Sequence, residues 1–308
     1  ASVWASFAAD IASLSAARLL QALGGCAGIV ASRAMVRDLF DERASAQVYS
    51  LLMLVMGLAP ILAPVIGGFL IANFEWQVIF WVLAAFGALC IPAVFFGLGE
   101  TLPPEKRHRG LSLAGVGRAY LALCMDRPFL AFALANALLS SAMFAYITGS
   151  PFVFIELHGL APEAYAILFG VNAAGLIAAS QVNALLLRRI SGRAILKAAM
   201  TFHLAAALAL LGFTLFMPQA FWPLAACIFL VVSSYGFVGA NATAAAMARA
   251  DGNAGSASAL TGILQFALAA VMGGLVGAFN DGSALPMALV ILAASLSGTL
   301  VRLAARRA

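Results

Sequence analysis

Apolar stretches of about 20 residues recur along the whole chain, and they limit its possible folds more than any other feature. A helix of that length crosses the ~30 Å hydrocarbon layer of a membrane. Strands of a membrane β-barrel alternate apolar and polar residues, whereas the segment 195–216 is apolar at nearly every position. The sequence therefore predicts an all-α membrane protein.

We predict nine full spans and one shorter apolar segment at residues 1–9. Only 9% of the 308 residues are charged, against roughly 25% in soluble domains, so lipid is the expected surrounding. The spans are expected at residues 14–35, 48–72, 77–97, 128–149, 164–187, 195–216, 222–247, 257–278 and 285–303.

The basic residues are distributed unevenly among the predicted turns. All but one of the 17 lysines and arginines fall on alternate turns, and the intervening turns carry none. The positive-inside rule places the basic turns in the cytoplasm, together with the C-terminus. These turns account for the net charge of +5, so we do not expect nucleic-acid binding. The set comprises Arg33, Arg37, Arg43, Lys106, Arg107, Arg109, Arg118, Arg127, Arg188, Arg189, Arg193, Lys197, Arg249, Arg302, Arg306 and Arg307.

A long polar stretch divides the chain into two parts. Residues 100–127 contain Pro103, Pro104 and a cluster of charges, which indicates a cytoplasmic linker between two helical bundles. Residues 1–99 then form the remainder of an N-terminal bundle, with a partial helix and three spans. Residues 128–308 form a C-terminal bundle of six helices.

A short sequence repeat favours two bundles of parallel topology. The run Ala-Met-Val-Arg at 34–37 ends the first full span, and Ala-Met-Ala-Arg at 246–249 ends the seventh. If the halves are equal, two helices and most of a third precede residue 1.

The one basic residue outside the alternating set belongs to a motif. Arg18, Gln21 and Gly24 resemble the Arg-x-x-Gln-Gly-x-Gly motif in the fourth helix of the major facilitator superfamily, with Ala22 in place of one glycine. The resemblance implies that Arg18 faces the bundle and couples to a titrating acid or to the substrate. The alternative is that Arg18 extends to the lipid headgroups.

The next predicted span contains a second pattern of this superfamily. Ala63, Pro64, Gly67 and Gly68 are similar to the fifth-helix motif of its antiporters, with small residues in place of several glycines. Small residues let helices approach closely, and proline bends a helix. Tight packing alone is the alternative reason for the same residues.

A third pattern lies in a basic turn. Arg188, Arg189, Gly192 and Arg193 are similar to the cytoplasmic gating loop in the second half of the superfamily. The positive-inside rule by itself is the alternative explanation for the arginines.

Longer stretches resemble the Bcr/CflA drug-resistance exporters, and they are residues 33–40, 51–68, 80–81, 100–103 and 150–153. The resemblance implies a major facilitator fold of two parallel-repeat bundles, with the first two helices and part of the third missing. It also implies export of small amphipathic drugs across the inner membrane by a monomer, in exchange for protons. The proton gradient is the expected energy source, and we expect no cofactor, no metal and no enzymatic activity.

Proton exchange usually needs an acid within the membrane, yet all twelve aspartates and glutamates fall in loops or at helix ends. In related exporters the titrating carboxylates lie on the first helix, which we expect to precede residue 1. We therefore expect that this fragment alone does not transport. His203 lies within a span and offers an alternative proton relay, although a lone histidine there is more typical of packing.

Polar, aromatic and methionine side chains within the spans are the expected lining of a substrate site. Flexible methionines and aromatic rings suit varied amphipathic compounds. In the alternative interpretation, the polar members form hydrogen bonds between helices. The candidates are Tyr49, Met53, Met56, Asn136, Ser140, Met143, Tyr146, Asn172, Tyr235, Asn241 and Gln265.

Three competing interpretations remain open. An intramembrane hydrolase needs a paired serine and histidine or two acids at membrane depth, and no acid accompanies His203. The antiporter-like motif around Pro64 argues against a carrier of a metabolite such as a sugar or amino acid. The short first segment and the unequal halves argue against a complete ten-helix carrier.

Overall fold

All regular structure in the described chain is helical. A computed structural model of the protein describes residues 1–101, 113–250 and 253–304, with only the helix backbone described at 56–61, 64–65, 68, 72 and 113–114. The elements are α1 (Ser2–Ser6), α2 (Ile11–Leu39), α3 (Glu42–Asn73), α4 (Gln77–Gly97), α5 (Leu113–Met125), α6 (Arg127–Pro151), the π-helix η2 (Phe152–Leu157), α7 (Pro162–Leu186), α8 (Gly192–Phe216), α9 (Phe221–Met247), α10 (Ala254–Ala278) and α11 (Leu285–Ala304).

The predicted all-α membrane fold is confirmed. Among the described residues, eight helices are long and apolar enough to cross a membrane: α2, α4, α6 continued by η2, and α7 to α11. The one predicted span that is not among these eight, at 48–72, lies within the 32-residue helix α3.

Polar caps explain why α2 and α3 begin several residues before the apolar stretches that predicted them. The carboxylate of Asp10 accepts a hydrogen bond from the backbone N–H of Ser13 at 2.7 Å, and Asp41 accepts one from Ala44 at 2.8 Å. Each cap satisfies a backbone donor that the first turn of a helix leaves unpaired. Hydropathy does not register these polar first turns.

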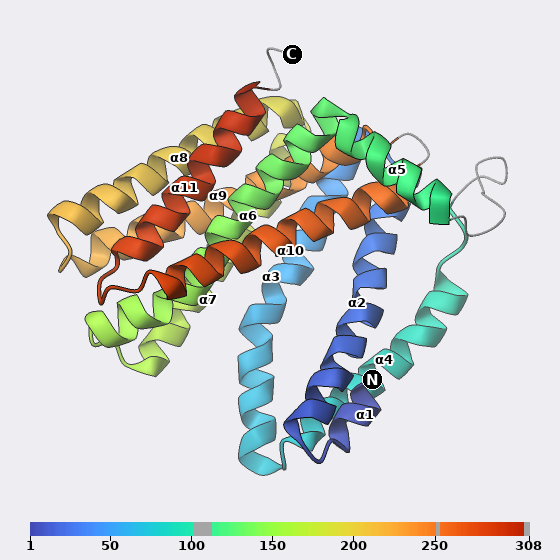
Figure 1. Ribbon diagram of the computed structural model, residues 1–308, viewed down its shortest axis with the longest axis horizontal. Coiled ribbons are helices and arrows are strands. Elements are labelled where there is room, and N and C mark those ends of the chain that lie inside the picture. The colour runs from blue at the N-terminus through green and yellow to red at the C-terminus, as the bar shows by residue number, and fades with distance from the viewer. Residues whose placement is uncertain (102–112, 251–252, 305–308) are drawn as a thin grey trace.

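The predicted linker contains a helix that we did not expect. Residues 113–125 form α5, which packs against α6 and α10 and lies across one end of the bundle (Figure 1). Pro103 and Pro104 lie outside the described residues. The predicted linker at 100–127 therefore includes a helix in its second half.

The helices form two arms that meet at one end and diverge toward the other (Figure 1). We call α1 to α4 the N-terminal arm and α6 to α11 the C-terminal arm. At the junction α3 packs against α7 and α9, and α2 packs against α10. Within the N-terminal arm, α1 lies against α2 and α4.

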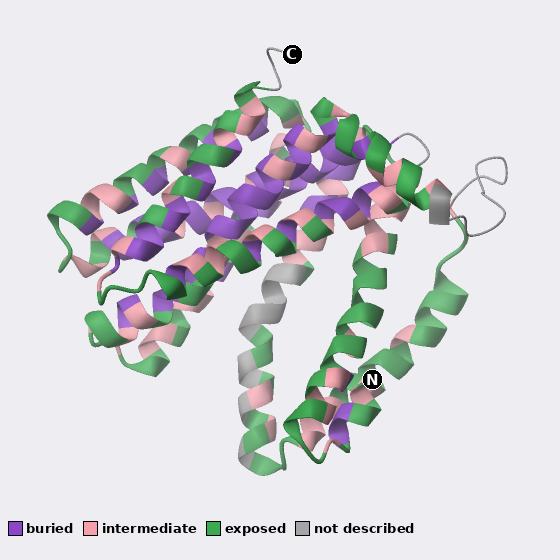
Figure 2. Cartoon of the chain, viewed as in Figure 1, coloured by how far each residue is buried: buried purple, intermediate pink, exposed green. Residues whose placement is uncertain are grey.

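Burial differs sharply between the arms. Buried residues are concentrated in α6 and α9, whereas exposed residues cover most of α2 and α4 (Figure 2). All residues of α4 are described and none is buried, and in α2 only Ala17 and Val36 are buried. The apolar surface of the N-terminal arm is thus available to lipid.

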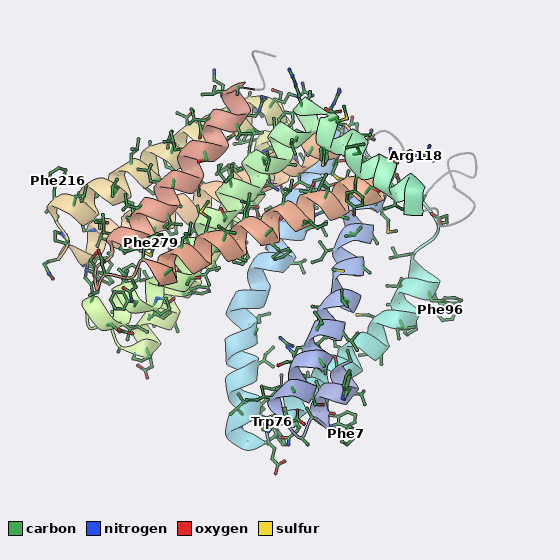
Figure 3. All side chains as sticks on the ribbon, viewed as in Figure 1. Phe7, Trp76, Phe96, Arg118, Phe216 and Phe279 are labelled. Carbon is green, nitrogen blue, oxygen red and sulfur yellow. The ribbon has the colours of Figure 1, made fainter. Side chains whose placement is uncertain are left out.

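The turns that carry arginines lie together at the junction of the arms. The Nε of Arg37 donates to the carbonyl of Met247 at 2.9 Å, and Arg249 pairs with Asp126 at 3.3 Å. Aromatic side chains occupy the opposite ends of both arms, with Trp76 on one and Phe216 on the other (Figure 3). Basic residues on one side, with aromatic residues at the ends of spans, are typical of a membrane protein.

A glycine allows α7 and α9 to pack at close range. A Cβ atom added to Gly236 in α9 would lie 2.6 Å from the carbonyl oxygen of Leu176 and 2.9 Å from the amide nitrogen of Ser180, both in the backbone of α7. Backbone atoms cannot move aside as a flexible side chain can, so any larger residue must push the two helices apart.

We predict that Gly236→Ala lowers the free energy of unfolding by about 1–3 kcal/mol, because overpacking outweighs the helix propensity of alanine. Thermal unfolding of the purified protein in detergent measures the change. Gly212→Ala in α8 is the matched control, because no atom lies within 4 Å of the Cβ position there. Equal melting temperatures for the two variants contradict the prediction.

Candidate functional site

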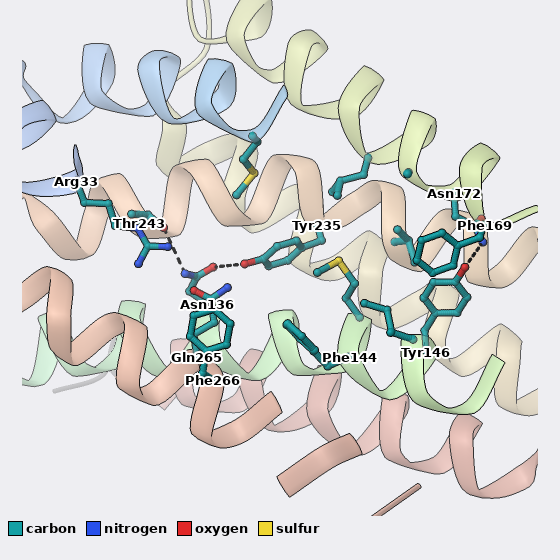
Figure 4. Close-up of a pocket in the computed structure, with 16 residues that line it drawn as sticks. Arg33, Asn136, Phe144, Tyr146, Phe169, Asn172, Tyr235, Thr243, Gln265 and Phe266 are labelled. Atoms are coloured by element: carbon teal, nitrogen blue, oxygen red, sulfur yellow. Dashed lines mark hydrogen bonds between the residues drawn. The ribbon is translucent and has the colours of Figure 1, made fainter. Parts of the chain in front are cut away.

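A cavity of about 240 Å³ lies at the junction, between α6, α7, α9 and α10 of the C-terminal arm and α2 and α3 of the N-terminal arm. Figure 4 shows that its two ends are polar and its middle is apolar. The lining residues are Arg33, Met53, Asn136, Met143, Phe144, Tyr146, Ile147, Phe169, Asn172, Ala173, Leu176, Val232, Tyr235, Thr243, Gln265 and Phe266.

The first polar end is built around Asn136, which is fully buried in α6. Its Nδ2 donates to the hydroxyl of Thr243 at 3.3 Å, and its Oδ1 accepts from the hydroxyl of Tyr235 at 3.2 Å. Arg33 and Gln265 lie beside this group (Figure 4). The Nε2 of Gln265 donates to Ser140 at 2.9 Å, which ties α10 to α6.

The second polar end lies between α6 and α7. The Nδ2 of Asn172 donates to the hydroxyl of Tyr146 at 2.9 Å, and the Tyr146 ring stacks on Phe169 with centroids 5.8 Å apart. The hydroxyl of Tyr146 is therefore held at the end of the cavity opposite Arg33 (Figure 4).

Apolar side chains from both arms line the middle of the cavity. Met53 of α3 fits against Gly239 of α9, where a Cβ would lie 2.2 Å from the Met53 methyl group. Met143, Phe144 and Phe266 add flexible and aromatic surface, with the last two rings 6.2 Å apart at 70°. Surfaces of this kind adapt to apolar bodies of differing shape.

Most of the predicted lining candidates meet at this cavity, and they come from five different helices. These are Met53, Asn136, Met143, Tyr146, Asn172, Tyr235 and Gln265. The predicted helical face of α6 is also present, since Asn136 and Met143 line the cavity and Ser140 supports it from behind.

Three candidates lie elsewhere or outside the described side chains. The hydroxyl of Tyr49 donates to the carbonyl of Arg33 at 3.1 Å and so joins α3 to α2. Asn241 donates to Asn183 at 2.7 Å, in the packing of α9 against α7. The side chain of Met56 lies outside the described residues.

Sequence reasoning missed Arg33 and Thr243 as lining residues. Arg33 was assigned to a cytoplasmic turn because it is close to the end of an apolar stretch, but α2 continues to Leu39 and keeps Arg33 within the helix. The sequence carries no signal for this, because hydropathy does not reveal where α2 ends. Phe144, Phe169 and Phe266 were indistinguishable from packing residues.

Arg18 does not reach the cavity. Its Nη1 donates to the Oε1 of Gln21 at 2.6 Å, and its guanidinium lies 5.8 Å from the ring centroid of Phe80 in α4. Gln21 in turn donates to Ser2 of α1 at 2.7 Å. Gly24 has open space beside it. In this arrangement the motif joins helices of the N-terminal arm.

The fifth-helix motif is only partly described. Ala63 is exposed, and Gly67 is half-buried with no atom within 4 Å of its Cβ position. The side chains of Pro64 and Gly68 lie outside the described residues.

Polar contacts join the start of α3 to the turn between α7 and α8, and we call them the junction latch. Arg193 makes two parallel hydrogen bonds to the carboxylate of Glu42, at 2.9 and 3.0 Å. The Nε of Arg43 donates to the carbonyl of Leu187. A Cβ at Gly192 would lie 2.6 Å from the Oδ1 of Asn241, so a larger residue there must displace the Asn241 side chain.

The remaining residues of the predicted gating loop face away from the latch. Arg188 and Arg189 are both exposed. Of the three arginines, Arg193 is the one that pairs with the N-terminal arm among the described residues.

His203 is a packing residue between α8 and α9. It is almost fully buried, and its Nδ1 lies 2.8 Å from the hydroxyl of Ser234. Ser234 donates its own proton to the carbonyl of Val231 at 2.7 Å, so the hydroxyl accepts from the histidine. His203 does not line the cavity.

Comparisons with known proteins agree with this architecture. Residues 1–274 match the Major Facilitator Superfamily. The chain is 34% identical over 305 residues to the uncharacterized MFS-type transporter YdgK of Bacillus subtilis, covering 97% of this chain and 74% of that one. It is 31% identical over 278 residues to the bicyclomycin resistance protein homolog of Haemophilus influenzae, covering 90% and 69%.

Further similarities are shorter in extent or more distant in sequence. The chain is 33% identical over 174 residues to the multidrug resistance protein MdtL of Escherichia coli, covering 56% of this chain and 43% of that one. The crystal structure of the human organic anion transporter MFSD10 superposes with a TM-score of 0.75 at 18% identity, covering 98% and 73%, which shows a shared fold. The predicted resemblance to drug-resistance exporters is confirmed, and the chain belongs to the Major Facilitator Superfamily.

Proposed function

We propose that the protein exports small amphipathic drugs across the inner membrane, with the junction cavity as the substrate site. The observation that carries the proposal is the position of the cavity, which is lined by residues of both arms. A site between two arms can be exposed to either side of a membrane when the arms rock against each other. The family is one of transporters, so we do not propose an enzymatic activity.

The lining chemistry supports a drug rather than a highly polar metabolite. A sugar or amino acid site needs many fixed polar groups, whereas this cavity combines two small polar ends with methionine and aromatic walls. Relatives of the chain bear the names bicyclomycin resistance protein homolog and multidrug resistance protein. Both lines of support concern the class of substrate and not its identity.

The arrangement of the arms supports alternating access. The arms meet where the arginine-bearing turns lie and diverge at the other end (Figure 1). If those turns and the C-terminus are cytoplasmic, as the positive-inside rule implies, this conformation is closed toward the cytoplasm. The junction latch is then the cytoplasmic gate of a monomer.

We further propose that the proton gradient supplies the energy, without a cofactor. Among the described residues, no aspartate or glutamate lines the cavity. A proton-carrying carboxylate therefore belongs outside this set of lining residues, and Arg18 remains the residue that the family motif associates with coupling. The acids of the junction, such as Glu42, act in the latch.

We predict that Glu42→Gln weakens the latch and exposes the residues beneath it. Glu42 and Arg193 are partly exposed, so the pair contributes about 0.2–1 kcal/mol, which corresponds to at most about a fivefold shift in the gate equilibrium. The readout is the maleimide labelling rate of Ala46→Cys, a buried position beside the pair, with the natural cysteines replaced by serine.

Arg189→Gln is the control for this measurement, because its exposed side chain lies on the same turn and does not pair with Glu42. Labelling that is faster in Glu42→Gln and unchanged in the control supports the gate. Equal labelling in all three proteins argues against it.

We predict that the full-length protein, reconstituted in proteoliposomes with an imposed pH gradient, moves the neutral drug chloramphenicol and that the drug drives counterflow of protons, followed with an internal pH dye. Asn172→Leu removes a polar group of the cavity and should raise the apparent KM about fivefold or more. Asn253→Leu is the control, since Asn253 is exposed and makes no side-chain cap bond.

The same assay tests the coupling residue and the class of substrate. Proton movement that survives Arg18→Gln excludes Arg18 from coupling. The absence of a response to any hydrophobic drug favours a metabolite carrier.

A further inference from the structure

The cavity contains buried polar atoms that nothing in the described chain satisfies. The Nη1 of Arg33 has no hydrogen-bond partner among the described residues, and neither do the Oε1 of Gln265 and the Oδ1 of Asn172. Gln265 and Asn172 each use one half of the amide and leave the other half unpaired. Buried polar groups are almost always paired, so an unpaired set within one cavity indicates groups that await a ligand.

Arg33 is the strongest member of this set, because its guanidinium stays charged in proteins. The surrounding side chains of Asn136, Thr243 and Gln265 are neutral (Figure 4). Among the described residues, no carboxylate forms an ion pair with Arg33. A buried positive charge normally pairs with an anion, and Arg33 has no such partner in the part of the chain that the structure describes.

The backbone holds Arg33 in place independently of its side chain. The hydroxyl of Tyr49 donates to the Arg33 carbonyl at 3.1 Å, and α2 also packs on α10. The N-terminal arm thus contributes the guanidinium of Arg33 to the cavity wall, while most of the other lining residues come from the C-terminal arm.

We propose that the cavity binds an amphipathic carboxylate, with its carboxylate on Arg33 and its apolar body against Met143, Phe144 and Phe266. A hydrogen-bonding substituent at the far end of the ligand then meets Asn172 and Tyr146. This proposal rests on the proposed function in one respect, namely that the cavity is the substrate site. It adds the charge and the orientation of the substrate.

The electrostatics and size of the site select this class. A cationic drug brings a second positive charge to an apolar cavity, and a neutral one leaves the guanidinium unpaired. A carboxylate matches the planar fork of an arginine and forms two parallel hydrogen bonds with it. The volume of about 240 Å³ lies just below the range of about 300–1,000 Å³ for ligand pockets, so the ligand is small.

The test uses three probes with one skeleton and different charge: 3-phenylpropionate, 3-phenylpropionamide and 3-phenylpropylamine. Binding to the purified protein in nanodiscs is measured by isothermal titration calorimetry. We expect the carboxylate to bind more tightly than the amide and the amine, by about tenfold or more, because only it forms a charge-assisted pair with Arg33. Arg33→Gln removes this preference, and Arg33→Lys retains part of it.

Lys197→Gln is the control, because it removes one positive charge at an exposed position of α8 outside the cavity. Thermal unfolding and size-exclusion chromatography establish that each variant is folded. A carboxylate preference that persists in folded Arg33→Gln overturns the proposal, as does tighter binding of the amine or amide.

The outcomes separate this proposal from the proposed function. If the amide and amine bind as well as the carboxylate and Asn172→Leu weakens all three, the cavity remains a substrate site and the assignment to carboxylates fails. If none of the probes binds, the carboxylate assignment fails, and transport of the neutral drug by the full-length protein decides the proposed function by itself.

Discussion

In the hydrocarbon core of a bilayer no water is present to form hydrogen bonds with a backbone amide or carbonyl. Each span therefore forms a helix, in which these groups pair with one another. This constraint explains the long helices from α6 to α11, and polar side chains cap the starts of α6 and α8. It also makes side chains the only polar groups available inside the protein. The buried side chains of Asn136, Tyr235 and Gln265 therefore point to a site, because burying a polar group costs free energy unless it has a hydrogen-bond partner or binds a ligand.

The helices of the two arms differ in how closely they pack. In the C-terminal arm, glycines such as Gly236 and Gly175 let helices approach until side chains or backbone atoms nearly touch. In the N-terminal arm, α4 buries none of its residues and α2 buries two. The contacts that hold the N-terminal arm to the rest of the chain are concentrated at its arginine-bearing end, in α3 and the end of α2. A junction held at one end is suited to rocking about that end.

Much of the fold could be predicted because hydropathy and charge alternation report directly on spans and turns. The span predicted at 77–97 agrees with α4 at both ends, whereas α3 begins earlier because Asp41 and a polar first turn precede the apolar stretch. The helix α5 was missed because thirteen residues in a polar region are too few for a span. The lining of the cavity was partly predictable, since rare polar residues in apolar helices have few other roles. Arg33 was not, because hydropathy cannot distinguish a turn from the last turns of a long helix.

The shared lining of the cavity links ligand binding to the arrangement of the arms. Arg33 and Met53 come from the N-terminal arm, and the residues facing them come from α6, α7, α9 and α10. A ligand that touches only one arm has the same affinity whether the arms are together or apart, and so it cannot bias the motion. A molecule long enough to touch both arms loses contacts when they separate. A bound molecule of this kind therefore slows the separation of the arms around the cavity. Its release must precede or accompany the movement of Arg33 away from α6.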